Sequence, residues 1–294
     1  MQTLDYQNCK LCPRMCGVDR TAGELGFCGM PAYPLAARAA GHYWEEPVIS
    51  GGFGSGAVFF SGCTLRCVFC QNASISAGGF GKPMTAKELR ACFEGLIDEG
   101  CENINLVTAT QFLPTVTEAL TPRLPVPVVY NCGGYERVET LRALEGLVDV
   151  YLPDYKYADT VLAGRLSAAP DYPEVARAAI LEMLRQTGPA RIEDSRLIRG
   201  TLIRHLVLPG FLDNSLDAVS WLAREAVPRG ALVSIMGQYC PMPGMAPPLD
   251  RRVSRDEYAA VLSWAQLCGL RDGFFQDLDS ASSEYIPDFD LTGL

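Results

Sequence analysis

Apolar and polar positions follow two different periods along most of this chain. From Ala57 onward, short apolar runs alternate with longer stretches in which apolar residues recur every three or four positions. A short apolar run is typical of a buried strand, and the longer repeat indicates a helix that packs by one face. Strands are predicted at residues 57–61, 103–108, 127–131, 148–153, 201–208 and 232–236. Helices are predicted at residues 85–99, 111–119, 135–144, 172–186, 215–226 and 254–268.

Local signals mark the ends of two predicted helices. Thr85 is followed three residues later by Glu88, the pattern of a capping box, and Gly100 suits the position just after that helix. Ser254 is a candidate N-cap for the last helix. Strands and helices that alternate in this way predict an α/β fold of six β/α units, a partial (β/α)6 TIM-like barrel.

Three regions of the chain differ in composition. Residues 1–50 form a small Cys-rich N-terminal segment with several glycines. Residues 51–278 carry the alternating pattern of the predicted barrel. Residues 279–294 are polar and contain proline and glycine, so an irregular C-terminal tail is predicted there.

Composition and charge exclude several classes of protein. The chain has 294 residues, 12 of them cysteine, and a formal net charge of −9. No apolar stretch approaches the roughly 20 residues of a membrane span, and residues 1–6 lack a secretion signal. The negative charge argues against nucleic acid, so neither a nucleic-acid nor a membrane partner is expected. Cysteine-rich chains without a secretion signal use reduced thiols and metal ligands, which predicts a reducing, anaerobic cytoplasm.

The most informative stretch is a loop that follows the first predicted strand. Cys63, Cys67 and Cys70 stand there in the spacing Cys-x3-Cys-x2-Cys. A compact set of thiolates suits a soft metal centre such as a four-iron, four-sulfur (4Fe-4S) cluster. Three thiolates leave one iron of such a cluster open for a ligand. A zinc knuckle or buried free thiols are the alternatives.

The N-terminal cysteines form a second group. Cys9, Cys12, Cys16 and Cys28 stand close together in a segment too short for a core of its own. We expect them to form a closed four-ligand site, because a metal is normally needed to order such a segment. A second 4Fe-4S cluster and zinc both fit the spacing. Reduced cysteines that pack on the barrel are the alternative.

Polar residues follow the second and third predicted strands, at the end where β/α barrels place their chemistry. The hydroxyls of Thr108 and Thr110 suit the N–H groups of a ligand, and they equally suit caps of the next helix. Asn131 ends the third strand. Gly133 and Gly134 follow it, and they favour either close approach to a ligand or an ordinary turn.

Charged and polar residues also lie at the later strands. Asp154 and Lys156 point to one side of an extended chain, where they suit ligand hydroxyl and carboxylate groups or form a solvated ion pair. Arg204 needs either a ligand carboxylate or an internal Asp or Glu as its partner. His205 faces the opposite side and is predicted to be structural. Gln238 either binds a ligand oxygen or closes a turn.

The cysteine loop resembles the signature of the radical S-adenosylmethionine (SAM) superfamily, and Phe69 fits an aromatic residue often present there. The resemblance implies that the open iron of the cluster chelates the amino and carboxylate groups of SAM. An electron from the reduced cluster then cleaves SAM to methionine and a 5′-deoxyadenosyl radical, which abstracts hydrogen from a substrate. A reductant such as flavodoxin or ferredoxin is the implied electron donor.

Nearly the whole chain resembles the pyruvate formate-lyase activating enzyme group, and within it the PflX-type branch. The motifs that carry this resemblance are Glu-Glu-Pro at 45–47, Asn-Leu-Val-Thr at 105–108, Tyr-Asn-x-x-Gly-Tyr-Glu at 130–136, Asp-Val-Tyr-Leu-Pro-Asp at 149–154 and Cys-Pro-Arg-x-Cys-Gly-Val at 12–18. In that group the Asp-x-Lys pair and the arginine strand, here Asp154, Lys156 and Arg204, belong to the SAM site. The Gly-Gly-Glu element of many relatives is replaced here by residues 108–110.

The resemblance implies an oxidoreductase that activates a glycyl radical enzyme by abstracting hydrogen from a backbone glycine. Radical modification of another peptide or of a small molecule is the alternative enzyme function. A metal- or cluster-bearing binding module is the non-enzyme alternative. The residues expected to bind SAM are Phe69, Thr108, Thr110, Asn131, Asp154, Lys156, Arg204 and Gln238.

Overall fold

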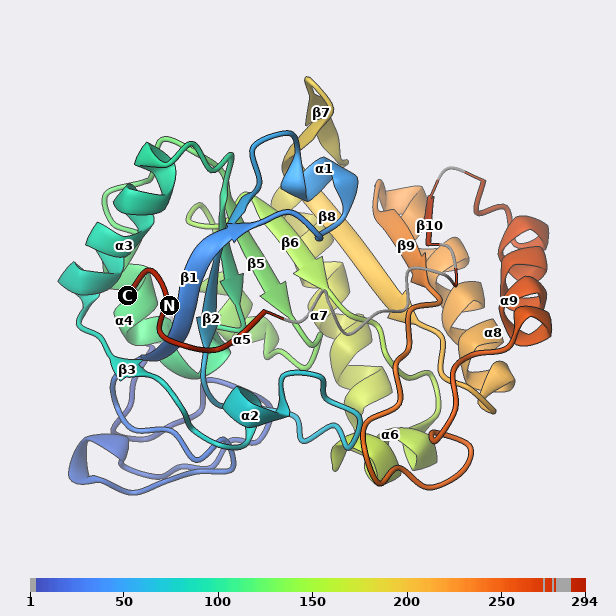
Figure 1. Cartoon of the computed structure of the whole chain (residues 1–294), viewed down its shortest axis with the longest axis horizontal. Coiled ribbons are helices and arrows are strands. Elements are labelled where there is room, and N and C mark those ends of the chain that lie inside the picture. The colour runs from blue at the N-terminus through green and yellow to red at the C-terminus, as the bar shows by residue number, and fades with distance from the viewer. Residues whose placement is uncertain (1–3, 272, 277, 279–286) are drawn as a thin grey trace.

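Six parallel strands run side by side in the order in which they occur along the chain (Figure 1). The computed structural model describes residues 4–271, 273–276, 278 and 287–294. The six strands are β2 (Ser55–Phe60), β4 (Ile104–Val107), β5 (Val128–Cys132), β6 (Val150–Pro153), β8 (Arg196–Leu206) and β9 (Leu232–Met236). All six predicted strands are therefore confirmed. The described strands form an open sheet, which is compatible with the expected partial barrel.

Four further strands extend the sheet and were not predicted. β1 (Leu35–His42) pairs antiparallel with β2, and β3 (Lys82–Pro83) pairs with β1. β7 (Arg191–Glu193) forms a hairpin with β8, and β10 (Phe274–Phe275) lies parallel to β9. β1 lies within residues 1–50, so part of that region belongs to the main sheet. The boundaries of the three expected regions otherwise stay predictions.

Helices connect the parallel strands and cover the outside of the sheet (Figure 1). The longer ones are α3 (Ala86–Asp98), α4 (Leu113–Ala119), α5 (Val138–Arg142), α6 (Thr160–Ser167), α7 (Tyr172–Thr187), α8 (Leu212–Trp221) and α9 (Arg255–Leu267). The two short ones are α1 (Pro47–Ser50) and α2 (Ala73–Ser76). All six predicted helices are present, although α5 is shorter than expected and α8 continues as a π-helix over Leu222–Ala226. α6 was not predicted.

The predicted helix ends are confirmed. The Thr85 hydroxyl caps α3 by accepting from Glu88 N, and the Glu88 carboxylate accepts from the backbone N–H of Thr85, which completes the capping box. Gly100 follows α3 with a left-handed φ of 96°. Ser254 caps α9 in the same way, with Glu257 as its reciprocal partner. These short motifs set the helix limits because they satisfy N–H groups that have no partner inside the helix.

Alternation along the strands gives the sheet an outer and an inner face. Val128 and Tyr130 of β5 pack outward in the core beneath α3 and α4, whereas Val129 faces inward. Inward-facing residues of β5, β6 and β8 pack against Ile49 of α1, which is 1% exposed. α1 therefore fills the inner face of the sheet with apolar side chains. The next inward positions toward the carboxyl ends of the strands are polar, and Asn131 is one of them.

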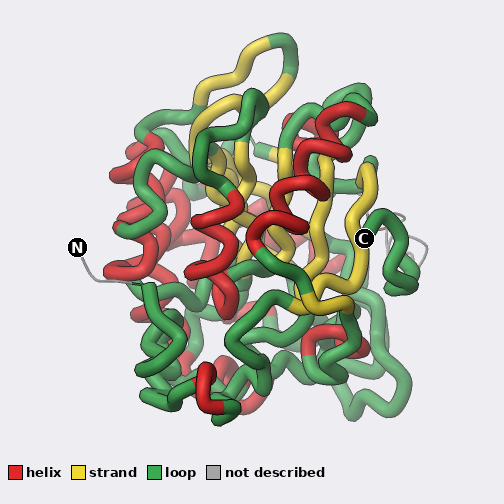
Figure 2. The backbone as a smooth tube through the Cα atoms, turned by 90° about the vertical axis from the view of Figure 1, so that its left-hand side faces the viewer, coloured by secondary structure: helices red, strands yellow, loops and turns green. Residues whose placement is uncertain are grey.

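Loops gather beyond the carboxyl ends of the parallel strands (Figure 2). They include the cysteine loop and most of the N-terminal segment. Residues 279–286 of the expected irregular tail lie outside the described residues. Residues 287–294 form neither helix nor strand, and they return to β1 through hydrogen bonds from Leu291 N to Ala37 O (3.0 Å) and from Ala39 N to Thr292 O (2.9 Å). Of the helices described, none has the length and apolar character needed to cross a membrane.

Candidate functional site

A cavity of about 280 Å³ opens at the carboxyl ends of the strands, on the inner side of the sheet. It brings together most of the residues that the sequence singled out. The predicted site residues that line it are Cys67, Phe69, Cys70, Asn131, Asp154, Lys156, Arg204 and Gln238. They come from the cysteine loop and from the ends of β5, β6, β8 and β9, far apart in sequence.

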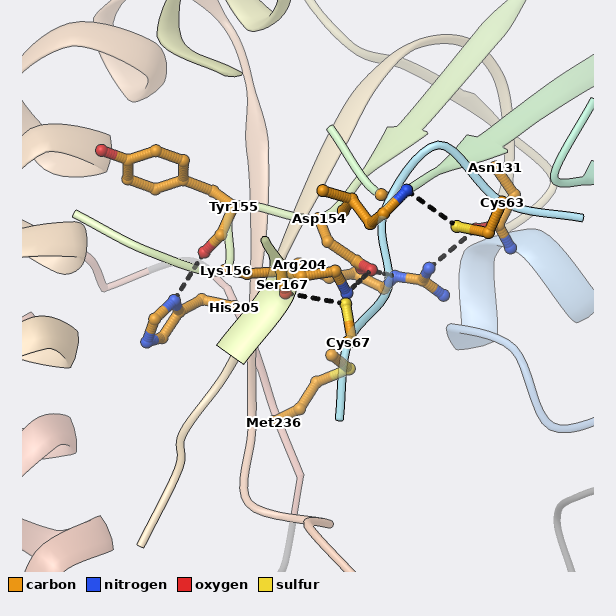
Figure 3. Close-up of polar contacts among 12 residues, drawn as sticks. Cys63, Cys67, Asn131, Asp154, Tyr155, Lys156, Ser167, Arg204, His205 and Met236 are labelled. Carbon is orange, nitrogen blue, oxygen red and sulfur yellow. Dashed lines mark hydrogen bonds and ion pairs between the residues drawn. The ribbon is translucent and has the colours of Figure 1, made fainter. Parts of the chain in front are cut away.

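Arg204 is the hub of the polar wall of this cavity (Figure 3). Its Nε donates to Asp154 Oδ1 at 2.9 Å, its Nη1 to Glu45 Oε2 at 3.0 Å and its Nη2 to Asn131 Oδ1 at 2.7 Å. The guanidinium thus has two carboxylate partners from distant elements. The expectation of an internal Asp or Glu partner for Arg204 is confirmed. A ligand would add to this network rather than complete it.

Asp154 and Lys156 point to the same side, as expected of an extended chain. Lys156 Nζ lies 2.5 Å from Asp154 Oδ2, and both side chains are less than one-fifth exposed, at 17% and 15%. Burial opposes the charged form of Asp154, but Arg204 and Lys156 outweigh it and hold the carboxyl pKa below its usual value. Burial also opposes the charge of Lys156, but Asp154 and Cys67 outweigh it and raise the ammonium pKa. The pair is therefore a buried, charged one and not a solvated one.

Glu45 is the functional candidate that the sequence-based site missed. Its Oε1 accepts from Asn131 Nδ2 at 2.9 Å and from Asn105 Nδ2 at 3.3 Å, while its Oε2 binds Arg204. Glu45 lies two residues before Pro47, the first residue of α1, so the packing of α1 inside the sheet carries the carboxylate into the cavity. The Glu-Glu-Pro motif at 45–47 contains this residue, but sequence analysis used the motif only as a sign of family resemblance and assigned no ligand contact to it.

Each of the three loop cysteines has a hydrogen-bond partner at its sulfur. Leu65 N donates to Cys63 Sγ at 3.4 Å, and Ser167 Oγ donates to Cys67 Sγ at 2.9 Å (Figure 3). Cys70 Sγ lies 3.4 Å from Ser76 Oγ. Such donors stabilise thiolates, and soft thiolate sulfurs are the ligands that iron–sulfur clusters use. The donor set therefore fits an iron–sulfur cluster.

Burial governs the protonation of these thiols when no metal is bound. It raises the pKa of Cys63 to about 12, with a smaller contribution from negative charge at Cys67. Burial likewise raises the pKa of Cys67, although Lys156 and the Ser167 hydroxyl oppose the change. In the described part of the chain, no three His, Cys, Asp or Glu side chains are already gathered around one metal position. The assignment of Cys63, Cys67 and Cys70 as cluster ligands stays a prediction, and so does that of Cys9, Cys12, Cys16 and Cys28.

A buried glutamine fixes the start of the cysteine loop. Gln111 Nε2 donates to Ser61 O at 2.8 Å, to Gly62 O at 3.0 Å and to Thr108 O at 2.9 Å. Its side chain ties the end of β2 to the end of β4. Sequence reasoning missed this role, because a glutamine at the start of a predicted helix carries no distinctive signal.

The two threonines lie outside the lining of the cavity. Thr110 is fully buried, and its hydroxyl donates to Glu136 Oε1 at 2.8 Å and lies 2.9 Å from Tyr130 OH. It therefore belongs to an internal polar cluster on the outer face of the sheet. Val107, just before Thr108, lines the cavity instead. The arrangement does not favour SAM contacts for Thr108 and Thr110.

Phe69 and Gln238 both lie at the cavity and contact its other side. Phe69 is 7% exposed and packs edge-on against Tyr239, with ring centroids 6.1 Å apart. Gln238 Nε2 donates to Met236 Sδ at 3.7 Å, and the residue lines the cavity. This wall offers aromatic faces and an amide to a ligand.

Gly134 makes room for the protein's own backbone. A Cβ placed on it would lie 2.1 Å from Asp154 O and 2.9 Å from Tyr172 OH, and its φ is 78°. The close approach at Gly134 is therefore to the protein's own backbone just after β6, and not to a ligand. It lets the Asp154 segment lie against the end of β5.

His205 is internal, as predicted. Its Nδ1 lies 2.7 Å from Tyr155 O and its Nε2 3.0 Å from Ser215 Oγ, so both ring nitrogens have partners. Burial lowers its pKa to about 4. A neutral imidazole with two partners holds β8 to α8 and has no role in the cavity.

Comparison with known proteins relates this chain to an archaeal protein and, more distantly, to a solved structure. No protein-family model matches the chain. The solved structure of methylornithine synthase PylB has a TM-score of 0.47 at 15% identity, over 81% of this chain and 71% of that one, a likeness too distant to carry an argument. The uncharacterized protein MJ0674 of Methanocaldococcus jannaschii is 30% identical over 277 residues, which cover 90% of this chain and 76% of that protein. The chain therefore belongs to the same family as MJ0674.

Proposed function

We propose that this protein is a radical SAM enzyme, with Cys63, Cys67 and Cys70 as ligands of a 4Fe-4S cluster. The observation that carries the proposal is that Cys67 and Cys70 line the same cavity as the buried charges of Glu45, Asp154, Lys156 and Arg204. When bound, the reduced cluster supplies the electron that cleaves SAM to methionine and a 5′-deoxyadenosyl radical able to abstract hydrogen.

The polar wall suits a ligand that carries both signs of charge. Lys156 and Arg204 offer N–H donors to the carboxylate of an amino acid, and Glu45 and Asp154 offer acceptors to ammonium or hydroxyl groups. All four are held in place by one another before any ligand arrives. Pre-arranged charges lower the cost of ordering on binding.

The aromatic and apolar residues supply the other half of the site. Phe69 and Tyr239 line one side, and Trp44 and Phe59 line another. Rings of this kind suit an adenine base by stacking, and they keep water away from a reactive intermediate. Their role in this chain is to hold and shield the ligand.

We further propose that the substrate is a polypeptide, as in activases of glycyl radical enzymes. A second cavity of about 570 Å³ shares Trp44, Glu45 and Gln238 with the first, which supports access for a bulky substrate. The open edge of the sheet supports the same reading. Another peptide or a small molecule is the alternative, and flavodoxin or ferredoxin is the proposed type of reductant.

The enzyme class is tested by anaerobic reconstitution with iron and sulfide, followed by dithionite and SAM. We expect 5′-deoxyadenosine by chromatography, and its loss together with the cluster signal when Cys63, Cys67 and Cys70 are all replaced by alanine (the triple-alanine variant). A Cys92→Ala, Cys268→Ala variant (the thiol control) removes two cysteines outside both groups and should retain both signals. An intact cluster that yields no 5′-deoxyadenosine would falsify the enzyme proposal and leave the binding module.

The substrate class is tested separately, on reconstituted protein that cleaves SAM. Candidate partners captured anaerobically are examined by electron paramagnetic resonance. A glycine-centred radical on a partner supports activation. Deuterium that moves from a small metabolite into 5′-deoxyadenosine contradicts it.

A further inference from the structure

A buried cation in the N-terminal segment has no carboxylate partner among the residues that the structure describes. Arg20 is 2% exposed and lies in a short 3-10 turn at Arg20–Ala22. Its guanidinium donates to the backbone oxygens of Met30 (3.0 Å), Gln111 (2.6 Å) and Pro31. Across the described ranges, no Asp or Glu forms a salt bridge with it. Burying an arginine without an anion nearby is costly, so a negative group is expected beside it.

The groups that face Arg20 are thiols. Cys9 Sγ lies 3.8 Å from its Nη1, and its Nε and Nη2 donate to the backbone oxygens of Met30 and Pro31, which follow Cys28 closely. Gly17 N, next to Cys16, donates to Cys9 O at 2.9 Å. The turns that carry Cys9, Cys16 and Cys28 are thus tied together, directly or through Arg20, although in the described residues no three of these sulfurs already surround one metal position.

A backbone N–H group points at one of the four sulfurs. Phe27 N donates to Cys16 Sγ at 3.3 Å. Donors of this kind stabilise thiolates and orient them toward a metal. The same kind of bond reaches Cys63 in the cluster loop.

We propose that Cys9, Cys12, Cys16 and Cys28 bind one metal centre as a closed four-thiolate site, with Arg20 as its charge partner. Four thiolates leave net negative charge on either a zinc ion or a 4Fe-4S cluster, which is the counter-charge that Arg20 lacks. A site with four protein ligands has no open position, so it would not bind SAM. The proposal does not depend on the proposed enzyme function.

The proposed N-terminal metal centre would also stabilise the loop that carries Cys63, Cys67 and Cys70. Arg14, between Cys12 and Cys16, donates through Nε to Thr64 O at 2.9 Å and through Nη1 to Ala168 O at 2.6 Å. A Cβ on Gly62 would lie 2.2 Å from Met30 Cγ, so the N-terminal segment packs directly on that loop. Metal binding that orders residues around Cys12 thereby also orders the loop that carries Cys63.

The test uses the full chain in the triple-alanine variant, so that only the N-terminal site can bind. Apoprotein is titrated with Co²⁺, whose thiolate charge-transfer bands report coordination, and anaerobically purified protein is analysed for metal. We expect one Co²⁺ per chain, and either one zinc or about four irons retained, which separates the two metal types. Adding Cys12→Ala and Cys16→Ala should abolish the bands.

Arg20 is tested by affinity. Arg20→Met should weaken Co²⁺ binding by about tenfold to a hundredfold, the usual effect of losing an outer partner of a metal site, and Arg20→Lys should restore most of it. Equal affinity in Arg20→Met would remove Arg20 from the proposal.

Alkylation of the wild-type chain covers the case in which a variant fails to fold. Iodoacetamide should label the four N-terminal thiols only after a chelator is added, whereas Cys268 should react equally before and after. If no Co²⁺ bands form and the four thiols react alike with and without chelator, they are packed thiols and the site does not exist.

Discussion

At the scale of single residues, the charges in the cavity depend on one another. Arg204 connects Glu45, Asp154 and Asn131, and Lys156 completes the set through Asp154. Because all are largely buried, removing one member leaves another without its partner. Such a loss costs more than the pair itself contributes, since the remaining charge still has to be buried.

A substitution at Glu45 tests this dependence. Glu45→Gln keeps the shape but removes the charge, so we expect the free energy of unfolding to fall by about 1–3 kcal/mol. Urea unfolding measures it. Glu193→Gln is the matched control, because Glu193 pairs with Arg191 on the exposed β7 hairpin and should contribute less than about 1 kcal/mol. Equal effects of the two substitutions would mean that Glu45 is solvated.

Glu136 gives a prediction about pH. Burial raises its pKa to about 8, while its oxygens accept hydrogen bonds from Thr110 and Tyr130. A carboxyl group with a raised folded-state pKa adds stability that is present below its unfolded pKa and is lost as pH rises through about 8. Between the unfolded-state pKa and the folded-state pKa of about 8, the free energy of unfolding falls by up to about 1.4 kcal/mol per pH unit.

The measurement is urea unfolding of the wild type and of Glu136→Gln at pH 5.5 and pH 9. The neutral amide does not titrate, so the wild type should lose more stability than the variant between the two values. Glu139→Gln, at a half-exposed position on α5, serves as the control and should follow the wild type. Parallel pH profiles for wild type and Glu136→Gln would contradict the buried neutral carboxyl.

At the scale of elements, the short helix α1 matters more than its length suggests. Its Ile49 packs against inward side chains of β5, β6 and β8, and the residues before it deliver Glu45 to Arg204. Sequence periodicity did not predict α1, because one helical turn is too short to show a period. β1 was missed for a related reason: its small alanines and glycine carry little strand propensity.

Ile49→Ala tests the link from this packing to the site. It should lower the free energy of unfolding by about 2–5 kcal/mol, because it leaves a cavity in a closed apolar cluster. Val161→Ala, at a position 77% exposed, should change it by less than about 0.5 kcal/mol. If SAM binding is intact in Ile49→Ala at a temperature where the protein is folded, α1 does not position Glu45.

At the scale of the whole molecule, the alternation of strand and helix patterns made the six parallel strands predictable. The six predicted helices also followed from sequence, whereas α6 and the four added strands did not. That the charges of Asp154 and Arg204 lie close together was also predictable, because parallel strands end at the same edge of a sheet. The partnership of Glu45 with Arg204 was not, since it joins residues 159 positions apart and no local pattern records it. That Thr110 lies outside the cavity lining was not predictable either, because alternation near a strand end does not tell which face a following turn presents.

Residues 287–294 return to β1, and a substitution at Gly293 tests how firmly they pack there. A Cβ there would lie 1.8 Å from Ala39 O, and the glycine has a φ of 75°. Gly293→Ala should therefore destabilise the protein by more than Gly269→Ala does. Gly269 has a similar φ of 88° but has nothing within 4 Å of its Cβ position. Both substitutions place an alanine at a left-handed φ, which costs about 1 kcal/mol of stability. Any further loss of stability in Gly293→Ala therefore comes from the contact with β1. Thermal unfolding measures it, and equal shifts would mean that residues 287–294 leave β1 in solution.

The bonds of Arg204 also have a consequence for the order of events during synthesis. Glu45 leaves the ribosome long before Arg204, which follows it by 159 positions. A nascent chain that ends before β8 has Lys156 to pair with Asp154 but lacks Arg204, the cation that pairs with Glu45. An unpaired carboxylate resists burial, so we expect the inner face to stay hydrated until β8 joins the sheet. The cavity is complete only late in translation, and a cofactor would be loaded into a finished chain rather than a growing one.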